Sequence, residues 1–344
     1  MEKSKFTSYL FNTILIISFL AIARDIVLPF IIAIFFWFLI NAMKGSFKHF
    51  FDNIIGLKRG SGFISLILSL FIVSYGVYEI GNIIGSNIIS ASQNISSIEG
   101  EVKMFINKTA AALHVSPESA QNFVKGLNFK AVLANLLSSI TSILRNAGLV
   151  AIYVLFILLE EKSFHKKIKA ISSTEAKRKK LEKTMQNINL KIRKWLGIKT
   201  VMSIATGVVS YIGMSIVGLN NAEFWAVLIF LLNYIPTFGS IVSSIFPILM
   251  ALIQFHTLTP FIIVTTFIVG AQIIIGNVID PKLMGKSLNL SPVVILLSLA
   301  AWGSLWGIAG MFLCVPLMAI VMLILSEIEG TKNVARLLSQ DGEI

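Results

Sequence analysis

The chain has 344 residues, of which 56% are hydrophobic and 13% charged, and its net charge is +12. Its mean hydropathy is +0.83, whereas a soluble domain has about a quarter of its residues charged. So few charged residues cannot cover the surface of a soluble globule of this size. The composition therefore excludes a soluble protein, a disordered chain and a coiled coil, and it predicts an all-α, polytopic integral membrane protein.

Apolar runs long enough to cross a bilayer give the order of the elements. They cover residues 8–23, 26–42, 62–89, 142–159 and 200–218, and a longer apolar region follows from 222 to 326. Arg24-Asp25 leads directly from the first run into the second, which favours a tight helical hairpin over a cleaved signal peptide. We expect about eight membrane segments, including two broken or re-entrant helical regions at 222–254 and 292–326.

The positive charge is concentrated in two segments, which indicates the orientation of the chain. The stretch 160–199 holds 13 basic and 4 acidic residues, net +9, and the loop 43–60 holds 4 basic residues and 1 acidic residue, net +3. Lysine and arginine are retained on the cytoplasmic side of short loops. We therefore predict that both segments and both termini are cytoplasmic, and that the nearly neutral segment 90–140 lies outside.

These features divide the chain into six predicted parts. They are three membrane helices (1–89), an extracytoplasmic helical segment (90–141), a fourth membrane helix (142–160), a basic cytoplasmic amphipathic helix region (161–199), a transport core with broken helices (200–326) and a cytoplasmic tail (327–344). In 172–196 a narrow apolar stripe is flanked by basic residues, which is typical of a helix that binds anionic lipids or packs on a neighbouring helix. A solvated linker is the alternative. Few aromatic residues interleave with this charge, so no nucleic-acid partner is expected.

The apolar region 222–326 is interrupted twice. Pro236 and Gly239 break the first apolar stretch, and unsatisfied backbone at membrane depth must be buried in protein or line a wet cavity. The hydrogen-bonding residues at this break are Asn233, Tyr234, Thr237 and Ser240. They could hold a small polar ligand or a cation, or they could satisfy the broken backbone. Broken helices of this kind form substrate sites in secondary transporters.

The second interruption lies within 292–326 and contains small and aromatic residues. Its candidates for packing or gating are Gly303, Trp306, Gly307, Gly310 and Pro316. The glycines are spaced by four and three residues, which permits close approach of helices and favours packing.

Two topologies fit the region between the interruptions. Each interrupted region is either one broken span, with 279–291 outside, or a re-entrant hairpin, with 279–291 cytoplasmic and 258–278 as the full span between them. Lys282 and Lys286 favour the hairpins, because the competing loop 255–257 has no basic residue.

Asp280 is the ionisable residue most indicative of a transport site. A carboxylate at membrane depth is costly and marks a functional site by default, so Asp280 could bind a cation or exchange a proton. Gln272 and Asn277 are its neutral candidate partners, and Asn277 shares a face with Asp280 if the helix persists. Alternatively, Asp280 caps a helix end at the interface and pairs with Lys282.

A family resemblance rests on several motifs taken together. They are Asn-Tyr-Ile-Pro at 233–236 with Gly239-Ser240, Gly-Asn-Val-Ile-Asp-Pro-Lys-Leu-Met-Gly at 276–285, Leu-Ser-Pro at 290–292, Trp302-Gly303, Trp306-Gly307 and Pro316-Leu317. With these residues the chain resembles the autoinducer-2 exporter family, also described as PerM-like permeases. The resemblance implies a bacterial inner-membrane transporter, homo-oligomeric and best described as a pentamer. It leaves the cargo open between the quorum-sensing signal autoinducer-2 and sodium–proton exchange.

Catalysis is not supported by the sequence. The four histidines lie in separate segments, Cys314 is the single cysteine, and hydrolase, metalloprotease and nucleotide-binding motifs are missing. No enzyme, cofactor or metal is therefore expected. The leading hypothesis is a secondary transporter that exports a small polar molecule. The alternatives are a sodium- or lithium-proton antiporter on the same fold and a membrane scaffold without transport.

Overall fold

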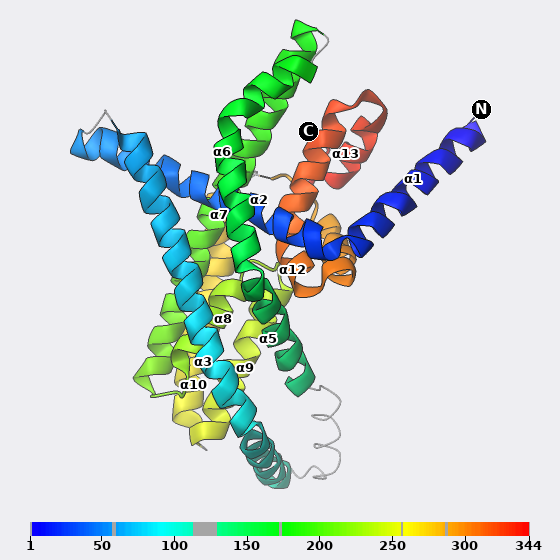
Figure 1. Ribbon diagram of the computed structural model, residues 1–344. Coiled ribbons are helices and arrows are strands. Elements are labelled where there is room, and N and C mark those ends of the chain that lie inside the picture. The colour runs from blue at the N-terminus through cyan, green and yellow to red at the C-terminus, as the bar shows by residue number, and fades with distance from the viewer. Residues whose placement is uncertain are drawn as a thin grey trace. The chain divides into compact units, whose positions relative to one another are not determined.

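The computed structural model in Figure 1 describes residues 2–56, 60–112, 129–171, 174–255, 257–285 and 288–343. These residues form helices, and the β-type contact among them is one isolated bridge between Leu290 and Ser339. The predicted all-α class is confirmed. Within the described ranges, six helices are long and apolar enough to cross a membrane, or seven if the bent pair 134–145 and 147–161 forms one span. The predicted number of about eight segments is not confirmed.

The chain divides into two compact units, which are described separately. The first covers residues 1–69, 143–196 and 286–344. It holds α1 (Glu2–Ile22), α2 (Arg24–Phe50), the π-helix η1 (Phe51–Ile55), the start of α3 (Ser61–Ala112), α6 (Ala147–Ile171), α7 (Glu175–Ile216) up to Leu196, α12 (Pro292–Glu327), the 3₁₀-helix η3 (Glu329–Thr331) and α13 (Lys332–Leu338).

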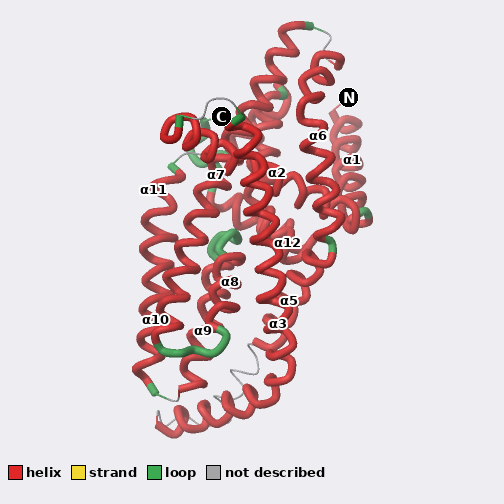
Figure 2. Tube along the Cα trace, turned by 60° about the vertical axis from the view of Figure 1, so that its left-hand side comes forward, coloured by secondary structure: helices red, strands yellow, loops and turns green. Residues whose placement is uncertain are grey.

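The second unit covers residues 70–142 and 197–285. It holds the remainder of α3 and of α7, most of α5 (Phe129–Arg145), α8 (Ala222–Leu232), α9 (Phe238–Phe255), α10 (Leu258–Ala271), the π-helix η2 (Gln272–Ile279) and α11 (Asp280–Met284). Figure 2 shows α10 and α11 as parts of one long rod, with α8 and α9 joined by a loop. Helices α3 and α7 run without interruption through the predicted boundaries at 89/90 and 199/200. Residues 113–128 of the predicted extracytoplasmic segment, and Lys286, lie outside the described residues.

Both predicted interruptions are confirmed, and at each of them the chain reverses. Between α8 and α9, Thr237 takes a left-handed conformation with φ 58°. The α-carbon of Gly239 then lies so close to the carbonyl of Leu232 that a β-carbon there would collide with it. Seven residues along a continuous helix would separate these groups by about 10 Å. Their contact therefore shows a tight helix–turn–helix reversal.

The second reversal lies within α12. Gly307 has φ 63° and ψ −141°, values outside the helical region, so that α12 consists of two helices joined at this residue. A β-carbon on Gly310 would collide with the carbonyl of Trp302. Trp306 is buried, and its indole nitrogen donates a hydrogen bond to the carbonyl of Leu20 at 3.1 Å. Gly310 and Trp306 therefore make packing contacts within the first unit.

The C-terminal tail is bound to the segment that precedes α12. Asn289, with φ 48°, donates from its side-chain amide to Asp341 Oδ1 at 2.7 Å and to the carbonyl of Glu343 at 2.8 Å. The amide of Gln340 donates to the carbonyl of Asn289 at 3.0 Å, and that of Ser291 to the carbonyl of Leu338 at 3.0 Å. The tail is therefore part of the first unit's packing.

Replacing Asn289 with alanine is expected to release the tail. The change removes two exposed hydrogen bonds and places alanine at a left-handed position, at a combined cost of about 1–2 kcal/mol. Faster amide hydrogen exchange at 338–343 measures the release. Asn220→Ala is the control, because its exposed side chain lies in the other unit. Unchanged exchange at 338–343 in Asn289→Ala would contradict the assignment.

Candidate functional site

Six polar side chains of the second unit meet between α7, the α8–α9 break and the start of α11. We call them the polar cluster: Lys199, Thr200, Ser203, Asn233, Tyr234 and Asp280. Helix α7 supplies the first three within about one turn, so that they lie on adjoining faces of the same helix. The break supplies Asn233 and Tyr234, and α11 begins with Asp280.

The residues at the break are held by α7. Asn233 and Tyr234 are 5% and 3% exposed. The side-chain amide of Asn233 donates to Ser203 Oγ at 3.1 Å, and the hydroxyl groups of Tyr234 and Thr200 lie 2.7 Å apart. The sequence directs this break, because Pro236 lacks an amide hydrogen and disfavours helical geometry at the residue before it.

Asp280 forms an ion pair with Lys199. Its Oδ2 lies 2.9 Å from Lys199 Nζ, and the two side chains are 8% and 12% exposed. The other carboxylate oxygen, Oδ1, is buried and has no hydrogen-bond partner among the described residues. A carboxylate oxygen that is removed from water and unpaired is costly. It is therefore available to a donor group of a ligand or to a cation.

The π-helix η2 explains why Asp280 faces α7. Along this rod the buried positions are Val264, Ile268, Ala271, Ile275 and Asp280, at spacings of four, three, four and five residues. The last spacing matches the wider turn of a π-helix, whose hydrogen bonds join residues five apart. An α-helix would instead have turned Val278 or Ile279 inward, and both are exposed.

The same π-helix separates residues that the sequence placed together. Asn277 is exposed whereas Asp280 is buried, so that the two do not share a face. The prediction assumed α-helical spacing, which the wider turn changes. Lys282 is also exposed, and the ion pair that the structure gives Asp280 is with Lys199.

The other predicted site residues divide between the cluster and its surroundings. Thr237 is exposed, and its carbonyl accepts a hydrogen bond from Ser240 Oγ at 2.9 Å, so this pair satisfies the turn itself. Gln272 lies half-buried on η2, and its Nε2 has no partner among the described residues. Gly303, Trp306, Gly307, Gly310 and Pro316 belong to the first unit.

Sequence reasoning missed the three residues that α7 contributes to the cluster. Lys199 ends the basic stretch and was counted only as a sign of cytoplasmic location. The sequence feature that could have indicated a site is the spacing of Lys199, Thr200 and Ser203, which places three polar side chains close together at the start of an apolar run. Their partners lie 30 to 81 positions away along the chain, and only folding brings them together.

Replacing Ser203 with alanine is expected to destabilise the second unit. The change leaves the buried amide of Asn233 without its acceptor, at a cost of about 1–2 kcal/mol. A lower midpoint of thermal unfolding in detergent measures it. Ser215→Ala, at an exposed position of the same helix, is the matched control. Equal midpoints for the two variants would show that the Asn233–Ser203 bond contributes nothing.

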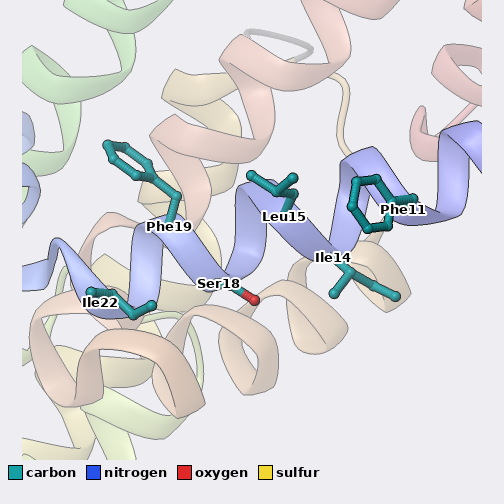
Figure 3. A pocket seen from close by; sticks show the side chains of 6 residues that line it. All are labelled: Phe11, Ile14, Leu15, Ser18, Phe19 and Ile22. Atoms are coloured by element: carbon teal, nitrogen blue, oxygen red, sulfur yellow. The ribbon is translucent and has the colours of Figure 1, made fainter.

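A shallow hollow on α1 offers little polar chemistry. Its volume is about 350 Å³, and Figure 3 shows that its lining comes from α1 alone. The lining residues are Phe11, Ile14, Leu15, Ser18, Phe19 and Ile22. Exposed apolar side chains of this kind suit contact with lipid chains. Among the described residues no group of His, Cys, Asp and Glu is placed to hold a metal ion.

Comparison with known sequences decides the family. The sequence model of the AI-2E family transporter matches residues 10–330, nearly the whole chain. The chain belongs to the AI-2E family of transporters. This AI-2E family chain is therefore a polytopic membrane protein of a transporter family, and the resemblance predicted from its motifs is confirmed.

Individual AI-2E relatives match to different extents. A Haemophilus influenzae protein, provisionally named a transport protein, is 30% identical over 94% of this chain and 93% of its own length. The AI-2 transport protein TqsA of Escherichia coli is 26% identical over 95% of this chain and 93% of its own length. A Borreliella burgdorferi protein, also provisionally named a transport protein, is 38% identical over 43% of this chain, a match that spans 41% of the relative.

Proposed function

We propose that this chain is a secondary transporter of the bacterial inner membrane that exports a small polar molecule similar to autoinducer-2, with the polar cluster as its binding site. The observation that carries the proposal is the buried pair of Lys199 and Asp280 beside the α8–α9 break. A buried ion pair beside a discontinuous helix of a membrane protein is typical of transport sites. The similarity to TqsA, a protein named for transport of AI-2, supports the cargo class.

The chemistry of the cluster suits a ligand with several hydroxyl groups. The ammonium group of Lys199 offers donors, the hydroxyls of Thr200 and Tyr234 both donate and accept, and Asp280 Oδ1 accepts. We further propose cytoplasmic termini, no enzymatic activity, and a homo-oligomer, for which the family resemblance favours a pentamer.

Flux of isotope-labelled autoinducer-2 into proteoliposomes tests this function. The double variant Asp280→Asn, Asn233→Ala is expected to reduce the flux more than about tenfold, because it removes the acceptor charge and a buried amide. Asn277→Ala, an exposed amide on the same rod, is the control and should transport normally. Flux that survives the double variant would reject the polar cluster as the site. Absence of flux in the wild-type chain would reject this cargo.

One observation favours a second function, exchange of sodium or lithium for protons. Lys199 is a fixed cation bound to one oxygen of Asp280 while the other oxygen is unpaired. A metal cation or a proton could replace the ammonium group at this carboxylate. Everted vesicles are then expected to show sodium- or lithium-dependent proton movement that Asp280→Asn abolishes. Proton movement that is independent of both cations would exclude this function.

A further inference from the structure

The first unit contains a second group of buried polar atoms that the proposed transport site does not use. It lies between α2, α6 and α7, and we call it the headgroup cluster: Trp37, Asn41, Gly45, Glu161, Asn189 and Arg193. Trp37, Asn41 and Gly45 are spaced four apart on one face of α2, and Asn189 and Arg193 are spaced four apart on α7.

Arg193 is the centre of this cluster. Its guanidinium lies across α2 and donates from Nη2 to the carbonyl of Asn41. A β-carbon at position 45 would lie 2.6 Å from the same nitrogen, so glycine at this position makes room for the guanidinium. Glu161 attracts the guanidinium electrostatically and accepts a hydrogen bond from the indole nitrogen of Trp37 at 3.2 Å. Three helices thus converge on one half-buried charge.

Three buried atoms of the headgroup cluster have unused hydrogen-bonding capacity. They are the donors Asn41 Nδ2 and Arg193 Nε and the acceptor Asn189 Oδ1, each without a partner among the described residues. Asn41 is 4% exposed, so its amide has lost its contact with water. Buried polar atoms in folded proteins are normally paired. Two donors and one acceptor on facing helices match a ligand that combines an oxyanion with a hydroxyl group.

The position of the cluster along the three helices indicates where that ligand comes from. Helix α2 is apolar from Ile26 to Ile40 and then carries Lys44 and Lys48, and α6 is apolar up to Leu159 and then charged. Helix α7 is basic up to Lys199 and apolar afterwards. All three therefore pass from apolar to charged sequence at the cluster, which is the level of the lipid headgroups.

The apolar stripe of α7 does not supply this contact. Ile188, Ile192 and Trp195 are buried within the first unit, so this part of the stripe packs on neighbouring elements. Lys194, the next basic residue along α7, is exposed and lies outside the headgroup cluster. We propose that the headgroup cluster binds the phosphate of an anionic phospholipid whose headgroup carries hydroxyls, such as phosphatidylglycerol. The oxyanion would accept from Arg193 Nε and Asn41 Nδ2, and a hydroxyl would donate to Asn189 Oδ1.

Thermal unfolding of the delipidated full chain in detergent tests the proposal. Phosphatidylglycerol is expected to raise the unfolding midpoint, and phosphatidylcholine at the same concentration is not. In Arg193→Met and Asn41→Leu the half-saturating concentration of phosphatidylglycerol should rise by about tenfold, because a charge-assisted hydrogen bond is lost. Lys194→Met removes the same charge from an exposed neighbouring position, and it should stay close to the wild type.

Three outcomes would overturn the proposal. Equal losses in Lys194→Met and Arg193→Met would show diffuse attraction to a basic surface rather than a site. Equal stabilisation by phosphatidylcholine would show that the phosphate charge is not recognised. Equal stabilisation by soluble glycerol 1-phosphate would assign the cluster to a free phosphate ester. If Arg193→Met does not fold, Arg193→Lys and Asn41→Leu replace it in the test. Arg193→Lys keeps the charge without Nε, and Asn41→Leu conserves side-chain size. In either variant an unchanged half-saturating concentration of phosphatidylglycerol would overturn the proposal.

Discussion

Asp280→Asn is expected to destabilise the folded chain more than the double variant Lys199→Met, Asp280→Asn. The single change leaves the ammonium group of Lys199, whose side chain is 12% exposed, without its counter-charge. Removing one partner of a buried ion pair costs about 3–5 kcal/mol, whereas replacing both by uncharged groups is often close to neutral. The double variant should therefore recover most of the stability that either single variant loses.

A double-mutant cycle on thermal unfolding in detergent measures this effect. The exposed pair of Glu175 and Lys179 on the same helix is the matched control, since its side chains are 69% and 71% exposed. Glu175→Gln and Lys179→Met should show no measurable coupling, because solvent screens exposed pairs. Coupling for Lys199 and Asp280 as small as that of the control would mean that the ion pair is hydrated and not a buried charge site.

Recovered stability would not restore transport under the proposed function. The double variant has neither the carboxylate nor the ammonium group, so that flux should remain lost although the chain folds. This result separates a role in binding the cargo from a role in holding the helices together. A stable double variant with normal flux would leave the pair with a structural role only.

Gly239→Ala and Gly310→Ala are expected to disrupt the two chain reversals and to destabilise the folded chain strongly. At each position a β-carbon would collide with a backbone carbonyl, that of Leu232 or of Trp302. A backbone carbonyl within a hairpin cannot rotate away as a flexible side chain does. Overpacking against mobile groups costs about 1–3 kcal/mol, so we expect more than about 3 kcal/mol here.

Gly270→Ala is the control for these variants. It lies within α10, no atom outside its own helix turn is within 4 Å of a β-carbon there, and alanine favours a helix by about 1 kcal/mol over glycine. Its unfolding midpoint should be equal to or higher than that of the wild type. If Gly239→Ala behaved in the same way, α8 and α9 would not approach each other as closely as the structure shows.

The sequence alone predicted the features that depend on local chemistry. Low charge and long apolar runs determine membrane insertion whatever the tertiary structure, because each helix must satisfy its own backbone in lipid. Proline and glycine act on the residues next to them, so the break at Pro236 and the presence of a second interruption within 292–326 could be predicted, whereas its position at Gly307 could not. The number of membrane segments in the chain could not be predicted, because α3 and α7 continue through the points where hydropathy changes.

The tertiary structure decided which side chains meet. The sequence predicts Asp280 as a costly charge and offers Gln272, Asn277 or Lys282 as its partner. In the structure the π-helix η2 turns Asp280 toward Lys199 instead, 81 positions earlier in the chain. Hydropathy carries no information about such a partner, and helical spacing assumed a turn that the π-helix widens. The same holds for Arg193 of α7. Its guanidinium can lie against α2 because Gly45 has no side chain at the point of contact. Local sequence determines where a helix begins, breaks and enters the membrane, whereas long-range packing determines which buried charges are paired.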